Sequence, residues 1–328
     1  MALQDFGGFL RRTKTGSGDF SRFVSRYVDG NELALLRGGG EAYKAMWAAI
    51  AGATDTVHLE SYILRSDRTG AEFARRLSAR AKAGVRVRVI YDAIGSLEID
   101  PDFVHRLRNA GVQFLEYHPV APWRPRWSWW RRDHRKCLIV DSRVAFTGGI
   151  NIADEHAPRA QGGSDWLDYH VRLEGPAAYE LDRVFRAVWF KETGRWFPLD
   201  ARPKPAVGAA PVWVAANHEF VYRYLIRSAY LAALKAARKE VLIANAYFAP
   251  DWRLSRAMAS AARRGVSISV LVPGETDVPA VSWAGRYQYE YLLTHGVKLF
   301  IWPGPVLHAK AAVVDENWST VGSYNMDH

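Results

Sequence analysis

The segment His134-Arg-Lys-Cys-Leu-Ile-Val-Asp141 occurs a second time, in altered form, as His308-Ala-Lys-Ala-Ala-Val-Val-Asp315. In both copies Lys follows His by two positions and Asp follows by seven, and a Gly and an Asn stand at +14 and +17. A chain of this composition should contain one such His-x-Lys-x4-Asp pattern about 0.02 times by chance. The two copies therefore indicate a duplicated structural unit that carries the same chemistry twice.

The segments around the two copies repeat in the same order. Each half begins with a β-rich apolar run, at residues 56–64 and 240–248. A helical stretch rich in Ala and Arg follows, and then a Gly-Val strand, a second helical stretch and another Gly-Val strand, starting at Gly84 and Gly111 and at Gly265 and Gly296. Glycine after a helix is a C-cap signal, and strands that alternate with helices predict an α/β layered fold in each half.

The repeat and the composition of the segments between its copies define the domains. Residues 1–30 are a basic lead-in, residues 31–190 form the first domain, and the Pro/Ala/Gly-rich residues 191–211 form a linker. The second domain covers residues 212–328. The first half continues for some 40 residues beyond its Asn151, whereas the chain ends just after Asn325, so we expect the second domain to be incomplete at its C-terminus.

The amino-acid composition indicates what kind of partner the chain can bind. The chain has 328 residues, 49% of them hydrophobic, and a net charge of +10, which favours an anionic partner such as nucleic acid or a lipid surface. No run of about 18 apolar residues is present, and the first 30 residues lack the apolar core of a signal peptide. The single cysteine, Cys137, alternates away from His134 and Lys136 and is predicted to be a small buried side chain.

The spacing within the motif has a physical reason. In an extended strand residues i and i+2 share a face, so each His and its Lys point to the same side. Two imidazoles, two ammonium groups and two Asn amides suit one tetrahedral phosphoryl group, whose developing charge they neutralise without a metal. We therefore expect neither a metal nor a cofactor.

The double motif resembles that of the phospholipase D superfamily, over nearly the whole chain. The segments Leu59-Glu-Ser-Tyr-Ile63, Gly148-Gly-Ile-Asn-Ile-Ala-Asp-Glu-His156, Val171-Arg-Leu-Glu-Gly-Pro176 and Leu307-His-Ala-Lys310 are similar to bacterial cardiolipin synthases that lack N-terminal transmembrane helices. The resemblance implies two phospholipase D-like α/β/α sandwich domains related by pseudo-two-fold symmetry, with the active site at their interface. It also implies phosphatidyl transfer between phosphatidylglycerol and a second lipid alcohol through a phosphohistidine.

The resemblance assigns roles to the motif residues. His134 is the expected nucleophile and His308 the acid and base, although the symmetry of the sequence leaves this choice open. Asp141 and Asp315 are expected to be structural supports. The residues expected to hold the phosphoryl oxygens are Lys136, Lys310, Asn151, Asn325, Ser323 and Gly149.

Three further features of the sequence lie outside the motif. Asp168 matches the place of a carboxylate against the nucleophilic imidazole, and its counterpart for His308 is expected to be missing. Tyr62 and Tyr247 end equivalent strands and are either core aromatics or pocket lining. Six histidines outside the motif are expected to have no part in the chemistry: His58, His105, His118, His170, His218 and His295.

The first half carries an insertion, at about residues 119–132, directly before His134. It contains Trp123, Trp127, Trp129 and Trp130 together with Arg124, Arg126, Arg131 and Arg132. Indoles and guanidiniums suit a phospholipid headgroup interface, which places the protein in the cytoplasm, peripheral on the inner face of the bacterial cell membrane. The alternatives are stacking on single-stranded nucleic acid and tryptophans that cap the core.

Rival functions remain open at this stage. A phospholipase or nuclease of the same superfamily would use the same groups with water as the acceptor. A binding module without activity is disfavoured because both His/Lys pairs are intact. No obligate nucleic-acid partner is expected, and neither the acceptor lipid nor the oligomeric state can be inferred.

Overall fold

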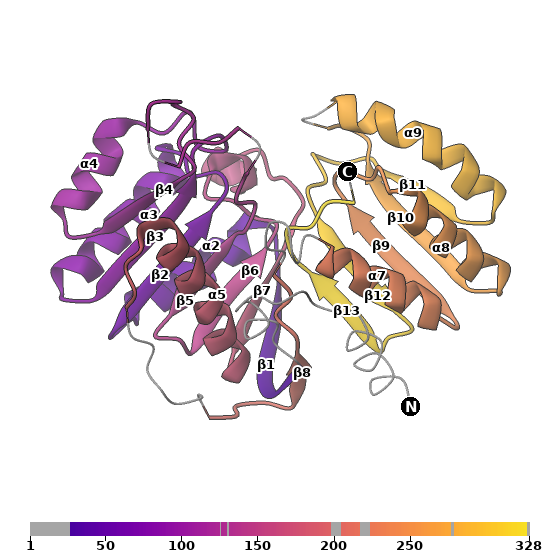
Figure 1. Cartoon of the computed structure of the whole chain (residues 1–328), viewed down its shortest axis with the longest axis horizontal. Coiled ribbons are helices and arrows are strands. Elements are labelled where there is room, and N and C mark those ends of the chain that lie inside the picture. Colours follow the sequence, from indigo (N-terminus) through magenta and orange to yellow (C-terminus); the bar gives the residue numbers. More distant parts are fainter. Residues whose placement is uncertain are drawn as a thin grey trace. The chain divides into compact units, whose positions relative to one another are not determined.

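The computed structural model describes residues 27–124, 126–129, 131–197, 205–216, 224–276 and 279–326. The chain divides into two compact units (Figure 1). The first unit contains Tyr27–Asp165 and Tyr169–Val214. The second contains Ala215–His328 together with three residues from far back in the sequence, Trp166–Asp168.

The first unit is built on an eight-stranded sheet in the order β4-β3-β2-β5-β6-β7-β1-β8. Strands β2, β3 and β4 are parallel, and the pairs from β2·β5 through to β1·β8 are antiparallel. The strands are β1 (Val28–Arg37), β2 (Thr56–Ser61), β3 (Arg86–Asp92), β4 (Gln113–Tyr117), β5 (Cys137–Val140), β6 (Val144–Gly148), β7 (Tyr169–Glu174) and β8 (Ala210–Val212).

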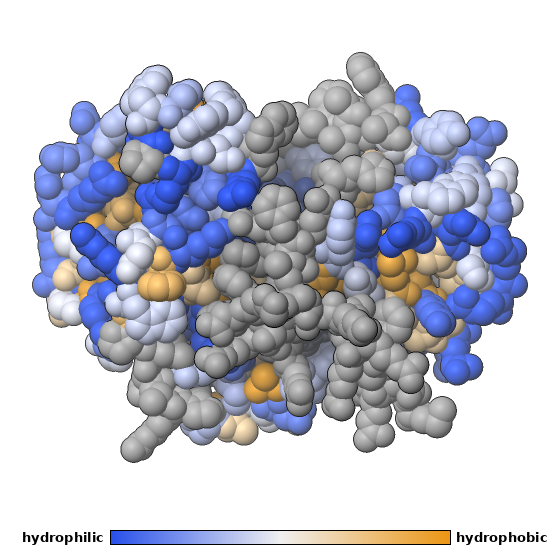
Figure 2. Space-filling view, viewed as in Figure 1, coloured by the Kyte–Doolittle hydropathy of each residue, from blue (hydrophilic) through white to orange (hydrophobic). Residues whose placement is uncertain are grey.

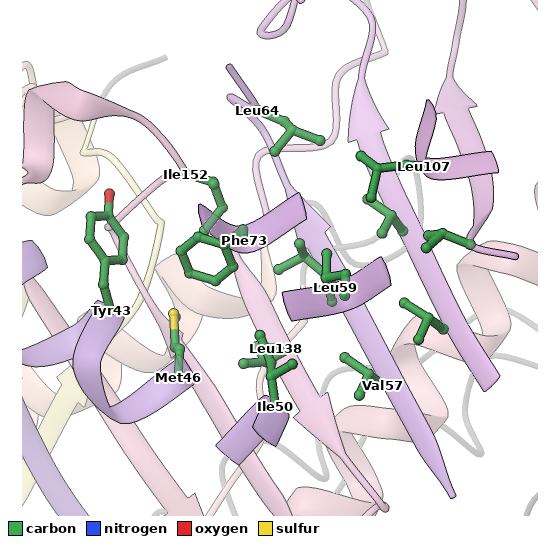
Figure 3. Close-up of a cluster of buried hydrophobic side chains, with 14 of the residues drawn as sticks. Tyr43, Met46, Ile50, Val57, Leu59, Leu64, Phe73, Leu107, Leu138 and Ile152 are labelled. Carbon is green, nitrogen blue, oxygen red and sulfur yellow. The ribbon is translucent and has the colours of Figure 1, made fainter. Parts of the chain in front are cut away.

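Helices cover both faces of this sheet. They are α2 (Gly38–Ala51), α3 (Arg68–Lys82), α4 (Pro101–Asn109) and α5 (Pro176–Thr193), with short 3-10 turns η2 (Asp154–His156) and η3 (Arg159–Gln161). One core includes Met46 and Ile50 of α2, Phe73 of α3 and Leu59 of β2 (Figure 3). The other face packs residues such as Ile139 against α5. The predicted α/β/α layering is thus confirmed for the first unit.

The second unit repeats the central part of this arrangement. Its five-stranded sheet has the order β11-β10-β9-β12-β13, with β9, β10 and β11 parallel. The elements are α7 (Leu225–Ala236), β9 (Glu240–Asn245), α8 (Trp252–Arg263), β10 (Ser267–Pro273), α9 (Pro279–Thr294), β11 (Lys298–Trp302), β12 (Lys310–Val314) and β13 (Trp318–Val321). The strand order matches β4-β3-β2-β5-β6, so the repeat expected from the sequence is confirmed in both sheets.

Local sequence signals explain where these elements begin and end. The side chains of Asp67 and Asp251 accept the backbone N–H three residues on, and so cap the equivalent helices α3 and α8. The glycine of each Gly-Val pair has a positive φ, between 84° and 93°, which a residue without a Cβ adopts readily.

In the view of Figure 2, hydrophilic residues predominate on the coloured surface and hydrophobic ones form small patches. Within the described ranges, no helix combines the length and the apolar character needed to cross a bilayer.

Candidate active site

The two motif strands occupy the same place in their sheets. Strand β5 lies between β2 and β6, and β12 lies between β9 and β13, antiparallel to both neighbours in each case. Lys136 directly precedes β5, and Lys310 is the first residue of β12. In both units the motif His and Lys therefore stand where the central antiparallel strand begins.

The motif aspartates hold the C-terminal end of each motif strand in place by hydrogen bonds. Asp141 accepts backbone N–H groups of Thr54, Asp55 and Thr56 at 2.8–2.9 Å, and Asp315 accepts those of residues 238–240 at 2.7–2.8 Å. Burial alone would raise the pKa of either carboxyl, but these hydrogen bonds lower it below the ordinary value. The geometry is that of the structural supports expected from the sequence.

Each motif lysine folds back onto its own histidine. The Nζ atom of Lys136 donates to the backbone oxygen of His134 at 2.8 Å, and Lys310 donates to the backbone oxygen of His308. Both lysines are buried, with 2% of their surface exposed. Because a buried ammonium is costly unless it has partners, an anion beside it would be strongly favoured.

Tyr62 and Tyr247 lie beside the motif residues in equivalent positions. The ring of Tyr62 is centred 4.6 Å from that of His134, and the ring of Tyr247 is centred 5.9 Å from that of His308. The motif lysines lie 5.0 and 5.5 Å from the same tyrosine rings. Of the two interpretations left open, the structure favours aromatics that line the site.

Asp168 is bonded to the second histidine. Its Oδ2 atom lies 2.7 Å from Nδ1 of His308, and both side chains are buried. The connection arises because Leu167 pairs with Leu307, and the His308 N–H donates to the Leu167 oxygen at 2.8 Å. Asp168 thus lies against His308 and not against the expected nucleophile His134, so that expectation is wrong. The expectation that His308 lacks an orienting carboxylate is also wrong, since the three residues Trp166–Asp168 belong to the second unit.

The Asp168 contact indicates the tautomer of the neutral His308 ring, that is, which ring nitrogen carries the proton. If Nδ1 carries the proton that Asp168 accepts, Nε2 holds the lone pair and is the atom available for proton transfer. The ring of Trp166 lies 5.6 Å from that of His308. Sequence reasoning missed Trp166, which no motif marks and which contacts a histidine 142 positions further along the chain.

The residues expected to bind phosphoryl oxygens differ in which of their hydrogen-bonding atoms are already bonded within the protein. The side-chain oxygen of Asn151 accepts the N–H of Ile63 at 3.1 Å, which leaves its NH2 group as the donor for an anion. The equivalent oxygen of Asn325 is buried without a hydrogen-bond partner in the described structure. The N–H of Gly149 is committed to the oxygen of Tyr169 at 3.1 Å, and Ser323 is half-buried.

Three tryptophans of the insertion before His134 are exposed. Trp123 is 84% exposed, Trp129 53% and Trp127 45%. For these three, the alternative that they cap the core is wrong. Trp130 lies outside the described residues.

The arginines of the insertion are partly engaged within the first unit. Their side chains form ion pairs with Glu116 (Arg124, 2.6 Å), Glu192 (Arg126, 3.7 Å) and Asp92 (Arg132, 3.2 Å). Arg131 is exposed. The pair of Arg124 with Glu116 is at the surface, where such contacts are weak and exchange readily for a phosphate. Arg126 and Arg132 instead meet buried carboxylates, Glu192 and Asp92, and have a structural role.

Comparisons with known proteins agree with this arrangement. The family model described as cardiolipin synthase, PLD-like domain, matches residues 46–189 and 230–328. Cardiolipin synthase B of Escherichia coli K12 is 37% identical over 311 residues, which span 91% of this chain and 73% of that protein. Cardiolipin synthase of Geobacillus kaustophilus is 32% identical over 302 residues, 90% of this chain and 60% of that protein.

Solved structures share the fold at much lower sequence identity. Phosphatidylserine synthase from Haemophilus influenzae has a TM-score of 0.65 at 12% identity, covering 99% of this chain and 83% of that one. Polyphosphate kinase from Porphyromonas gingivalis has a TM-score of 0.56 at 14% identity, with coverage of 90% and 46%. Taken with the duplicated motif, the family match and the curated relatives show that this chain belongs to the cardiolipin synthase family of phospholipase D-like proteins.

Proposed function

We propose that this chain joins phosphatidylglycerol to a second lipid alcohol by phosphatidyl transfer at an anionic membrane surface. The proposal rests on one observation: more than a third of the aligned residues are identical to those of cardiolipin synthase B over 91% of the chain, and both His/Lys pairs are intact. Phospholipid substrates follow from the family.

The reaction proceeds in two balanced steps. An imidazole nitrogen of His134 attacks the phosphodiester phosphorus, the bond to the leaving alcohol breaks, and His308 gives that alcohol a proton. The acceptor alcohol then loses its proton to His308 and attacks the phosphorus, which breaks the nitrogen–phosphorus bond and restores His134. With phosphatidylglycerol as donor, the first product is glycerol.

Each proposed role has a physical basis in its own unit. Asp168 fixes the tautomer of His308 and stabilises its imidazolium, which suits a group that gives and takes a proton. The buried lysines and the Asn amides neutralise the phosphoryl oxygens as charge develops, and one such preorganised donor typically contributes about 3 kcal/mol.

The acceptor is tested with the purified protein on phosphatidylglycerol vesicles. We expect cardiolipin and free glycerol in equal amounts, measured by mass spectrometry and by an enzymatic glycerol assay. Phosphatidic acid without cardiolipin would show that water is the acceptor and that the protein is a hydrolase. His134→Ala prepared in parallel is the control for contaminating activity.

The nucleophile is tested by trapping the covalent intermediate with a short-chain, soluble phosphodiester. The phosphodiester should carry a nitrophenolate leaving group, which needs no proton from His308. His308→Ala should then accumulate phosphoryl label after acid-free quenching, since it lacks the base for the second step, while His134→Ala should take up none. Label on His134→Ala and none on His308→Ala would reverse the two assignments.

Asp168→Asn tests the support of His308. The amide can keep the hydrogen bond but not the charge, and it permits the wrong ring tautomer, so kcat should fall about 100-fold or more. The matched control is Asp165→Asn, an exposed aspartate three residues earlier, which should retain full kcat. Equal activity of the two variants would remove Asp168 from the mechanism.

The tryptophan-arginine loop is tested by vesicle binding. Trp123→Ala and Trp129→Ala should weaken binding to anionic vesicles, and salt should weaken it further, because each basic residue near the surface contributes about 1 kcal/mol. Turnover of a soluble short-chain phosphodiester should not change. Unaltered vesicle binding, or an equal loss on both substrates, would contradict a membrane role for the loop.

A further inference from the structure

A buried polar cluster lies on the opposite side of strand β5 from the motif His and Lys. In the extended chain His134 and Lys136 share one face, and Arg135 and Cys137 share the other. Glu60 of β2, 1% exposed, meets both of the latter. Its Oε1 atom lies 3.2 Å from Nε of Arg135, and its Oε2 atom accepts from Sγ of Cys137 at 3.3 Å.

Asp133 completes the cluster. Its Oδ1 atom accepts the side-chain Nε of Arg135 at 2.9 Å and the backbone N–H of the same residue at 3.2 Å, which makes a tight turn around His134. The backbone N–H of Asp133 donates to Asp92 at 2.8 Å. The residues on both sides of His134 are therefore held by buried carboxyl groups, those of Asp92, Asp133 and Glu60.

The pKa values of the two neighbouring carboxyls in this cluster are shifted in opposite directions. Burial raises the pKa of Glu60 well above its ordinary value, and Asp133 raises it further, despite Arg135. Burial alone would also raise the pKa of Asp133, but Arg135 holds it at about 2. Oε1 of Glu60 and Oδ2 of Asp133 are buried and form no hydrogen bond in the described structure. Arg135, whose Nε lies 3.2 Å from Glu60 and 2.9 Å from Asp133, is the cation that both carboxyls face.

The second unit has no such cluster at the same positions. Where β2 and β5 pair Glu60 with Cys137, β9 and β12 pair Ala244 with Ala311, and Ala309 stands in the place of Arg135. There the backbone and ring of His308 are held by Leu167 and Asp168. The equivalent strand pair thus has alanine at all three positions, with Leu307 in the place of Asp133.

We propose that Glu60 and Arg135 are positioning residues for His134, which they hold from the back of strand β5 in the orientation for attack on phosphorus. The inference rests on the proposed function and adds to it a device that serves the first half alone. A buried ion pair often contributes little net stability compared with apolar residues, so retention of this cluster beside the nucleophile is better explained by geometry than by stability.

The variants separate positioning from folding. Glu60→Gln keeps a neutral side chain that can both donate and accept, so it should retain at least half of the wild-type kcat. Glu60→Ala and Arg135→Ala should lower kcat about 10- to 100-fold, with KM within twofold of wild type because both side chains lie on the face of the strand opposite His134 and Lys136. The combined change Glu60→Ala/Arg135→Ala/Cys137→Ala reproduces the alanines of the second unit and should fold yet show the same loss.

The control is His58→Gln, on the same face of β2 two residues earlier. His58 is equally buried and is bonded to Asp182 at 2.6 Å, so its loss should lower the melting temperature while kcat per folded molecule stays unchanged. The readout is the rate of phosphoryl-enzyme formation on His134 from a soluble phosphodiester, together with kcat and KM. Because this step precedes the acceptor, it responds to the cluster even if wild type makes no cardiolipin, which would refute only the proposed function.

Two outcomes would overturn the proposal. Unchanged rates of phosphoryl-enzyme formation in folded Glu60→Ala and in the triple variant would show that the cluster has only a structural role. A rise in KM with kcat unchanged would show instead that these residues act on substrate binding.

Discussion

The site depends on the hydrogen bonds that a carboxylate at the end of each motif strand accepts from the neighbouring strand. Asp141 and Asp315 both adopt a left-handed backbone conformation, with φ of 52° and 51°, and each gathers three successive backbone N–H groups at the start of the neighbouring strand. That contact sets the register between the motif strand and its partner. Because a slip of one residue would turn His and Lys to the opposite face of the sheet, the aspartate five residues after the lysine determines where the lysine points.

On this common scaffold the two histidines are supported in different ways. His308 receives a carboxylate directly on its ring, from a segment that is distant in sequence. The chain around His134 is held through its neighbours Asp133 and Arg135. A proton-transferring imidazole needs a defined tautomer, whereas a nucleophile needs above all a defined approach to phosphorus, so the two kinds of support suit the two proposed roles.

The repeat, the strand order and the role of the motif aspartates were predictable because each depends on local signals at fixed spacing. The partner of His308 was not, since Leu167 and Leu307 are 140 positions apart and nothing in either segment marks their pairing. The Glu60 cluster was missed for a related reason. A Glu in one strand and an Arg in another appear as ordinary charged residues until the register of β2 against β5 brings them together.

The insertion before His134 shows how the chain's positive charge is distributed. Three of its arginines face carboxylates of the first unit, so the part of the loop most clearly available to a partner is the exposed indole surface of Trp123, Trp127 and Trp129. Indoles favour the headgroup region of a bilayer because one edge is apolar and the other can donate a hydrogen bond. At the base of the loop, the buried Asp92 accepts from both Arg132 and the N–H of Asp133. The same carboxylate thus anchors the loop and fixes the residue before His134, so a surface that engages the tryptophans is connected to His134 by a short, hydrogen-bonded segment of chain.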